Sequence, residues 1–244
     1  MTELNKSILY NNAQELYVVG KSNIQACDRI ISVMKDAQMT YNPVIVYGPT
    51  GVGKTHLLFA VVNALKLPEV AFINASDIIS DYVTFIKNKK KDTNQPDIKS
   101  AIVAKFAGYN TVIIDSLHAL IGKAGMQDAF CEIIRELIDC KKQIIIVTDT
   151  VLSEYDVLSK ELDNNFKKTL LCTIEKPDND LMRNIINLHA ERGGISLDEE
   201  AAEWLSEQAE SVPYIIGAVK KISVVYEQKK DISLADVKKI LKEK

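Results

Sequence analysis

The sequence predicts an α/β domain with a doubly wound parallel sheet, followed by a small all-helical domain. Three observations support this. Short, almost continuously apolar runs alternate with segments of helical periodicity up to Pro177. Runs without polar alternation are typical of strands buried on both faces, as in parallel sheets covered by helices. After Pro177 only helical periodicity remains. We therefore expect a base domain over residues 1–176 and a helical domain over residues 177–244.

Five runs of strand length occur in the expected base domain, each bounded by turn or polar residues. They are PVIVY (43–47), VAFINA (70–75), TVIID (111–115), QIIIVTD (143–149) and TLLCTI (169–174). The helix-like segments between and before them are 24–37, 54–66, 77–88 and 127–140. Strands that alternate with helices in this way favour a parallel sheet with helices on both faces.

Capping signals mark the helices of the C-terminal part. Asp178, Ser196 and Ser233 are predicted N-caps, and Glu199 stands three residues after Ser196, which is the spacing of a capping box. The pair Gly193–Gly194 is expected to end the first helix. These signals divide the segment into several short helices.

Composition narrows the class of protein. The chain has 244 residues, 47% of them hydrophobic and 26% charged, as in an ordinary soluble protein. The N-terminal MTELNKSILYNN resembles no targeting signal, and no apolar run approaches the roughly 20 residues that cross a bilayer. We therefore expect a cytoplasmic location and no membrane contact. A formal net charge of −3 gives no global attraction to nucleic acid.

Metal-ligand spacing is missing from the sequence. The cysteines and histidines are scattered, without a CxxC pair, and we expect reduced thiols in a core. They are Cys27, Cys131, Cys140, Cys172, His56, His118 and His189.

GPTGVGKT matches the phosphate-loop pattern G-x-x-x-x-G-K-[ST] and lies between an expected strand and an expected helix. Backbone N–H groups and the helix N-terminus would surround an anion there, with glycines admitting the phosphate oxygens. Lys54 would neutralise the β- and γ-phosphates, and the Thr55 hydroxyl would bind Mg²⁺. The competing interpretation is a glycine-rich turn without a ligand. The expected nucleotide-binding residues of this segment are Gly48, Pro49, Thr50, Gly51, Val52, Gly53, Lys54, Thr55 and His56.

The third apolar run ends in Asp115. Downstream of a phosphate loop, a strand-end aspartate is typical of the Walker B carboxylate, which holds Mg²⁺ through water. The sequence thus predicts a P-loop NTPase with Lys54 and Asp115 as catalytic residues.

LYVVGKSN (16–23) and YNPVIVYGPTGVGKTHLL (41–58) resemble the AAA+ module of the bacterial replication initiator DnaA, as do VIIDSLHALIGK (112–123) and KQIIIVTD (142–149). The resemblance implies a five-stranded AAA+ sheet with a helical lid and ATP or ADP held between them. It also implies that adenine is contacted by the segment matching Tyr17, Val18, Val19, Gly20 and Asn23.

The resemblance further implies a helical insertion after the second strand, which in the family lines a channel for single-stranded DNA. Residues 76–109 occupy that position and contain Lys87, Lys89, Lys90 and Lys91, which could meet a nucleic-acid backbone. A solvated loop is the alternative. Full family members continue into a duplex-binding helix-turn-helix module, whereas this chain ends at Lys244. We therefore expect no sequence-specific duplex binding.

Three positions depart from the family's catalytic pattern. Ser116 replaces the second acid after Asp115, Asn165 replaces the arginine finger, and Pro213 replaces the sensor arginine of the lid. Asp149 falls at the family's sensor 1 position, where it is either a retained catalytic residue or a residue that merely caps a turn. Losing an arginine finger alone lowers turnover by roughly 10³–10⁵.

The expected function is therefore a stand-alone DnaA-like protein that binds ATP or ADP with Mg²⁺ and hydrolyses ATP weakly or not at all. We expect it to act as an accessory or regulator of DNA replication initiation, engaging another AAA+ protein or single-stranded DNA, as a monomer or weak dimer. Two alternatives remain. One is an active ATPase, such as a helicase loader or an initiator fragment, whose arginine finger comes from a partner. The other is a P-loop kinase for a small molecule.

Overall fold

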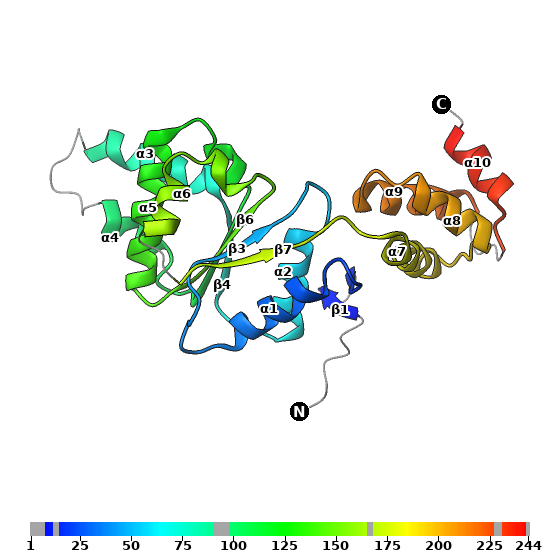
Figure 1. The fold of residues 1–244 in the computed structure, drawn as a ribbon, viewed down its shortest axis with the longest axis horizontal. Helices are drawn as coiled ribbons and strands as arrows, with labels where there is room; N and C mark the ends of the chain where they lie inside the picture. Colours follow the sequence, from blue (N-terminus) through cyan, green and yellow to red (C-terminus); the bar gives the residue numbers. More distant parts are fainter. Residues whose placement is uncertain (1–7, 12–14, 90–97, 165–167, 227–230, 243–244) are drawn as a thin grey trace.

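A five-stranded parallel sheet forms the centre of the larger part of the molecule (Figure 1). The computed structural model describes residues 8–11, 15–89, 98–164, 168–226 and 231–242. The strand order is β4-β5-β6-β3-β7, and every neighbouring pair is parallel. The strands are β3 (Val44–Tyr47), β4 (Val70–Asn74), β5 (Thr111–Asp115), β6 (Gln143–Thr148) and β7 (Leu170–Thr173). The predicted α/β class and all five strands are confirmed.

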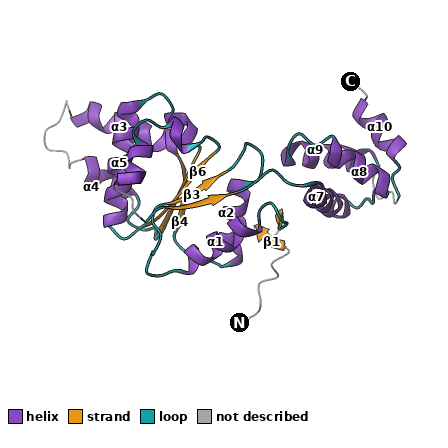
Figure 2. Ribbon diagram, viewed as in Figure 1, coloured by secondary structure: helices purple, strands orange, loops and turns teal. Residues whose placement is uncertain are grey.

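Helices cover both faces of this sheet (Figure 2). One face carries α1 (Ile24–Lys35) and α2 (Lys54–Ala64). The other carries α3 (Ala75–Lys89), α4 (Ile98–Lys105), α5 (Ala124–Asp139) and α6 (Leu158–Asn164). Successive strand residues enter opposite cores: Ile113 and Ile145 pack with α1 and α2, whereas Ile114 and Ile146 pack with the other set. Burial on both faces explains why the central strands β3, β5 and β6 have apolar runs without polar alternation.

The C-terminal helices, here called the lid, lie together at one end of the molecule (Figure 1). They are α7 (Asn179–Arg192), α8 (Glu199–Glu207), α9 (Val212–Val225) and α10 (Leu234–Lys242). Their apolar faces form a third core, which includes Ile186, Leu205, Ile222 and Val237. The helical character predicted for this segment is confirmed, while the division between residues 176 and 177 stays a prediction.

A two-stranded antiparallel hairpin precedes α1 and was not predicted from the sequence. It consists of β1 (Ile8–Asn11) and β2 (Glu15–Val18). Residues at the end of β2 alternate between two cores: Tyr17 and Val19 pack against the α1 and α2 side of the sheet, whereas Val18 packs against the lid. The chain between β2 and α1 therefore lies where the base and the lid meet.

Two of the three predicted N-caps are confirmed. The Leu181 N–H donates to Asp178 Oδ1 over 2.8 Å, and Ser233 exchanges hydrogen bonds with Asp236 at the start of α10. The prediction for Ser196 is wrong, because the cap of α8 is Asp198, whose Oδ1 accepts from the Ala201 N–H over 2.7 Å.

A contact distant in sequence explains the difference at α8. The Ser196 hydroxyl accepts from the Asp231 N–H, and its carbonyl accepts from the Ile232 N–H. Leu197 then forms a parallel bridge with Ile232, so the chain is still extended at this point. The helix can begin only after Asp198.

Among the residues that the structure describes, no helix combines the length and apolar character needed to span a membrane. The four cysteines are free; Cys27, Cys131 and Cys172 are buried and Cys140 is exposed.

The corrected cap yields a stability prediction. Asp198→Ala is expected to lower the free energy of unfolding by about 1 kcal/mol, because the Ala201 N–H loses its acceptor. Asp198→Asn is the matched control and should stay close to the parent, since asparagine caps as well as aspartate. Urea titration followed by circular dichroism measures both. Equal stability of the alanine and asparagine variants would contradict the assignment.

Candidate nucleotide site

At three positions, the backbone of the loop between β3 and α2 favours glycine over any other residue. A Cβ at Gly48 would lie 2.3 Å from the Ile174 carbonyl oxygen. Gly51 and Gly53 have φ of 80° and 93°, in the left-handed region, and Gly53 is the N-cap of α2. The glycine positions predicted from the motif thus follow from the shape of the loop. Such a loop at a helix N-terminus presents backbone N–H groups and partial positive charge to an anion.

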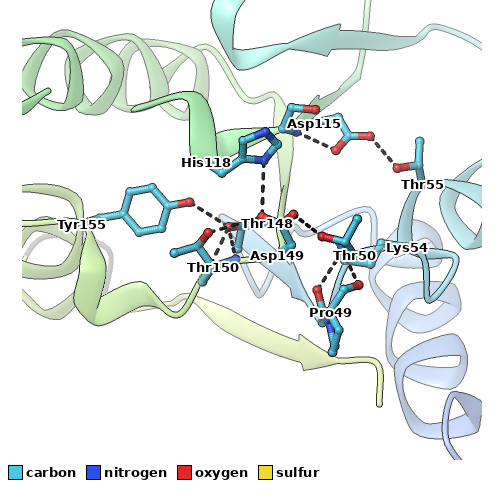
Figure 3. Close-up of polar contacts among 12 residues, drawn as sticks. Pro49, Thr50, Lys54, Thr55, Asp115, His118, Thr148, Asp149, Thr150 and Tyr155 are labelled. Atoms are coloured by element: carbon cyan, nitrogen blue, oxygen red, sulfur yellow. Dashed lines mark hydrogen bonds and ion pairs between the residues drawn. The ribbon is translucent and has the colours of Figure 1, made fainter. Parts of the chain in front are cut away.

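Lys54, the first residue of α2, folds back over the loop. Its Nζ donates to the Gly48 carbonyl over 2.7 Å and to the Pro49 carbonyl over 2.9 Å (Figure 3). Burial lowers the pKa of the ammonium from its ordinary value, and the carboxylates of Asp149 and Asp115 oppose that effect. The ammonium is therefore held against the loop, where two carboxylates act on its charge.

Thr55 and Asp115 point toward one another across the site (Figure 3). The Thr55 hydroxyl donates to Asp115 Oδ2 over 2.5 Å. Both groups offer hard oxygen atoms of the kind that Mg²⁺ prefers, and Mg²⁺ in nucleotide sites takes few protein ligands alongside phosphates and water. In the described part of the chain, no cluster of three or more His, Cys, Asp or Glu could hold a metal by itself. The pair therefore fits a magnesium ion that arrives with a nucleotide.

Asp149 follows β6 and faces the same space. Its Oδ2 accepts from the Thr50 hydroxyl over 2.7 Å, and its Oδ1 lies 3.3 Å from His118 Nδ1. The Thr50 hydrogen bond is the main cause that lowers the pKa of this carboxyl, with smaller contributions from His118 and Lys54. The geometry places Asp149 at the phosphate loop, as a sensor residue requires, although Thr150 Oγ1 also donates to it at 3.3 Å, as in a turn.

Ser116 adopts a left-handed conformation, with φ 60° and ψ 42°, immediately after Asp115. Its N–H donates to Asp115 Oδ1 over 2.6 Å. A non-glycine residue in this region stores backbone strain, which is common at functional sites. The conformation turns the chain from β5 into the 3₁₀ helix η1 (Leu117–Leu120), which carries His118.

These groups line one cavity of about 390 Å³ between the sheet edge and α9. Its lid side consists of Val212, Pro213 and Ile216, which carry no charge. The four arginines of the chain all lie elsewhere: Arg29 donates to the Leu171 carbonyl, Arg135 pairs with Glu161, Arg183 pairs with Asp180, and Arg192 ends α7. Within the described residues, Lys54 is thus the sole lysine or arginine that lines this cavity.

The segment expected to contact adenine is organised by one buried side chain. Asn23, only 4% exposed, accepts from the Gly20 N–H and donates to the Val18 carbonyl and the Tyr17 hydroxyl. Tyr17 also packs edge-on against His56, with ring centroids 5.3 Å apart. The segment expected to contact adenine and the phosphate-loop segment therefore meet through the contact between Tyr17 and His56. Asn23 holds the shape of its own loop.

A neighbouring cavity, lined by the segment expected to contact adenine, measures about 30 Å³, which is room for about two water molecules and not for a purine. Tyr17, Val18, Asn23, Val52 and His56 line it from the base. The lid contributes Leu181, Ile185 and His189 of α7, and the Cβ of Leu181 would approach a Cβ at Gly20 to 3.1 Å. If adenine binds between these groups, as the resemblance to DnaA implies, α7 has to shift away from residues 17–20.

Two sets of predicted positions fall partly outside the described residues. Lys90, Lys91 and Asn165 lie in the undescribed segments, whereas Lys87 and Lys89 belong to the last turn of α3. His118 was not predicted as a site residue. Its only sequence signal is its position three residues after Asp115.

A sequence model of the bacterial DnaA ATPase domain matches residues 7–173 of this chain. The chain belongs to the DnaA ATPase family. The DnaA of Dechloromonas aromatica is 33% identical over 210 residues, which cover 84% of this chain and 43% of that protein. This chain spans about half the length of the DnaA proteins that it matches.

Solved DnaA structures share the fold. Domain III of Thermotoga maritima DnaA superposes with a TM-score of 0.73 and 27% identity, covering 93% of this chain and 94% of that one. A DnaA bound to AMPPCP and single-stranded DNA gives a TM-score of 0.68 and 25% identity, with coverage of 87% and 64%. The predicted AAA+ class and the resemblance to DnaA are thereby confirmed.

The hydrogen bonds of Asn23 generate a prediction for this site. Asn23→Ala is expected to lower the free energy of unfolding by about 1–3 kcal/mol, because the buried Tyr17 hydroxyl and the Val18 carbonyl lose their donor. It should also weaken adenine-nucleotide binding, since residues 17–20 lose their shape. Urea titration and calorimetric titration with MgADP measure the two effects. Lys21→Ala, on an exposed neighbour, is the control; if both variants behave alike, Asn23 does not organise the segment.

Proposed function

We propose that this chain is a DnaA-type AAA+ protein that binds ATP or ADP with Mg²⁺ and hydrolyses ATP slowly or not at all. Its role is that of an accessory or regulator of DNA replication initiation. One observation carries the proposal: the phosphate cavity keeps the groups that bind a nucleotide, but its lid side is uncharged and no arginine of the chain reaches it.

Binding and catalysis require different parts of this cavity. The glycine loop, Lys54, Thr55 and Asp115 suffice to grip phosphates and a magnesium ion. Rapid turnover also needs groups that stabilise charge on the transferred phosphoryl. An arginine fork is the usual one, and a lysine supplies only a point charge in its place. Ser116 cannot supply a carboxylate, and Pro213 cannot supply a cation.

A nucleotide in this position would touch both the base and the lid. Because the two cavities are lined by α7 and α9 as well as by the phosphate loop, a bound nucleotide would link them and stabilise the fold by mass action. The protein would then use ATP or ADP to set the orientation of its lid. That suits a regulator, which engages another AAA+ protein or single-stranded DNA according to the nucleotide held.

An ATPase completed by a partner is the second candidate. It is favoured by the direct Thr55–Asp115 and Thr50–Asp149 contacts, which keep the magnesium and sensor positions together. An arginine from another AAA+ protein would then supply the missing charge. Phosphate release stimulated by such a protein, in single-turnover conditions, would favour this candidate over the regulator.

Restoring the lid arginine tests the proposed reason for weak turnover. Pro213→Arg should tighten MgATP binding about tenfold or more relative to MgADP, because a charge-assisted contact to the terminal phosphate contributes about 1.5–3 kcal/mol. The site accepts the change, since Pro213 is exposed and lies in the first turn of α9. Calorimetric titration of both nucleotides gives the ratio of the two Kd values.

Two variants control this experiment. Pro213→Gln adds a polar side chain without charge and should leave the ratio near that of the parent. Lys54→Ala should bind neither nucleotide, because the ammonium held against the loop is gone. An unchanged ratio in Pro213→Arg would show that this residue does not face the terminal phosphate. Full binding by Lys54→Ala would refute the nucleotide site itself.

Single-stranded DNA is the proposed nucleic-acid ligand, supported by the related DnaA that was solved with it. Replacing Lys89, Lys90 and Lys91 with glutamine should weaken oligonucleotide binding. It should also reduce the slope of log affinity against log salt by roughly 0.7 for each phosphate that the protein no longer neutralises. Fluorescence anisotropy across a salt series measures both quantities. Lys35, Lys66 and Lys141, which are exposed elsewhere, form a matched triple control. Equal behaviour of the two triple variants would exclude Lys89, Lys90 and Lys91 from DNA binding.

A further inference from the structure

His118 meets Asp149 at the phosphate cavity, although 31 positions separate them in the sequence. Asp149 follows β6, and His118 lies in η1, which follows β5. Because β5 and β6 are neighbouring parallel strands, their carboxyl ends bring the two residues to one edge of the sheet. His118 Nδ1 lies 3.3 Å from Asp149 Oδ1 (Figure 3).

The contact places a carboxylate beside one ring nitrogen. A carboxylate beside Nδ1 favours the tautomer with hydrogen on that atom, and an imidazole in this tautomer has its lone pair on Nε2, at the far side of the ring. Asp149 is itself held by the Thr50 hydroxyl at 2.7 Å, so its carboxylate is positioned from the phosphate loop. In this series Thr50 anchors Asp149 to the loop that would hold the nucleotide, Asp149 is the orienting carboxylate, and His118 is the group that could act as a base.

The contact between His118 and Asp149 is not explained by a contribution to fold stability. The His118 side chain is 50% exposed, and exposed ion pairs contribute little to stability. The ring nevertheless lines the same cavity as Lys54, Thr55 and Asp115. A half-exposed, oriented imidazole beside a magnesium and phosphate site has the properties of a group that accepts a proton.

We propose that His118 is the general base for the residual ATP hydrolysis of this protein, in place of the acid that Ser116 does not supply. In the step, a water oxygen forms a bond to the γ-phosphorus while the bond from that phosphorus to the β–γ bridging oxygen breaks. The bridging oxygen keeps the electron pair and leaves as part of ADP. The proton of the water passes to His118 Nε2, and from there to solvent.

This inference rests on the proposed nucleotide site and gives a reason for slow, rather than absent, turnover. A positioned base contributes roughly 10²–10⁴ to a rate. It does not replace the loss of an arginine finger, which lowers turnover by roughly 10³–10⁵. The protein should therefore hydrolyse ATP slowly, and most of that slow rate should depend on one imidazole.

Chemical rescue of a truncated variant tests the base. In single turnover with radiolabelled ATP, His118→Ala should release phosphate about 100-fold more slowly than the parent. Added imidazole should restore part of the rate, because it can occupy the space left by the ring. His118→Asn should be equally slow, since an amide keeps a polar side chain near Asp149 but cannot accept the proton. Lys123→Ala, an exposed residue just after η1, should keep the parent rate.

A measurement without turnover locates the ring. In protein labelled at histidine Cε1, the His118 signal is identified by its loss in His118→Asn. It should shift further with MgAMPPCP than with MgADP, because a general base for this reaction has to lie beside the terminal phosphate. Calorimetric Kd values for MgADP should be the same in the parent, His118→Ala and His118→Asn.

The outcomes separate this inference from the proposed function. Failure of the parent to bind any adenine nucleotide would refute the nucleotide site. Normal binding without any phosphate release would overturn the role of His118 and leave the site intact. The role is also overturned if His118→Ala stays within twofold of the parent, if imidazole restores nothing, or if the two nucleotides shift the His118 signal equally.

Discussion

The common edge at which β5, β6 and β3 end is the constraint on which the site depends. These three strands are neighbours and parallel, so their carboxyl ends deliver Asp115, Asp149 and the glycine loop to one place. The loop is fixed further because Gly48 has no room for a side chain beside the Ile174 carbonyl. The polar groups of the site thus come from the ends of the three largely buried central strands and need few contacts of their own to stay in position.

In the candidate nucleotide site, the groups suited to holding a nucleotide lie on the base side, whereas the lid side lacks a charge that could assist hydrolysis. Its base side has a cation, a magnesium-type oxygen pair and a helix N-terminus, all close together. Its lid side offers Val212, Pro213 and Ile216. Apolar lid residues still exclude water and close over a ligand, but they cannot stabilise charge that develops during phosphoryl transfer. Retention of nucleotide without rapid turnover is what the proposed role as a regulator requires.

The parts that could be predicted from the sequence are those whose signals are local. The phosphate loop is a continuous motif, and the strands are recognisable because burial on both faces removes polar alternation. Asp178 and Ser233 are caps determined by the residues beside them. The cap of α8 could not be assigned in this way, because Ser196 and Asp198 are both suitable residues. A bridge to Ile232, far along the chain, decides between them.

In the candidate site too, contacts between residues distant in the sequence could not be predicted. Asp149 was recognised by its position at a strand end, yet its pairing with His118 follows from strand order, which no local pattern contains. Similarly, the hydrogen bonds of Asn23 to Gly20, Val18 and Tyr17 could not be predicted from the sequence, and the expected contact of this segment with adenine stays a prediction. Residue types predicted where the candidate site lies. The partners of each side chain depended on the three-dimensional arrangement.

Tyr17 and Val19 pack in one core and Val18 in another, and this couples residues 17–19 to any rotation of the lid. Three consecutive side chains cannot follow two bodies that rotate in different directions, so a turn of the lid must distort residues 17–19, which are proposed to contact the nucleoside. Under that proposal, any binding energy that depends on the undistorted segment is lost when the lid turns, and linkage makes the effect mutual. A protein that binds the lid would then change the affinity for the nucleotide without touching the phosphate loop.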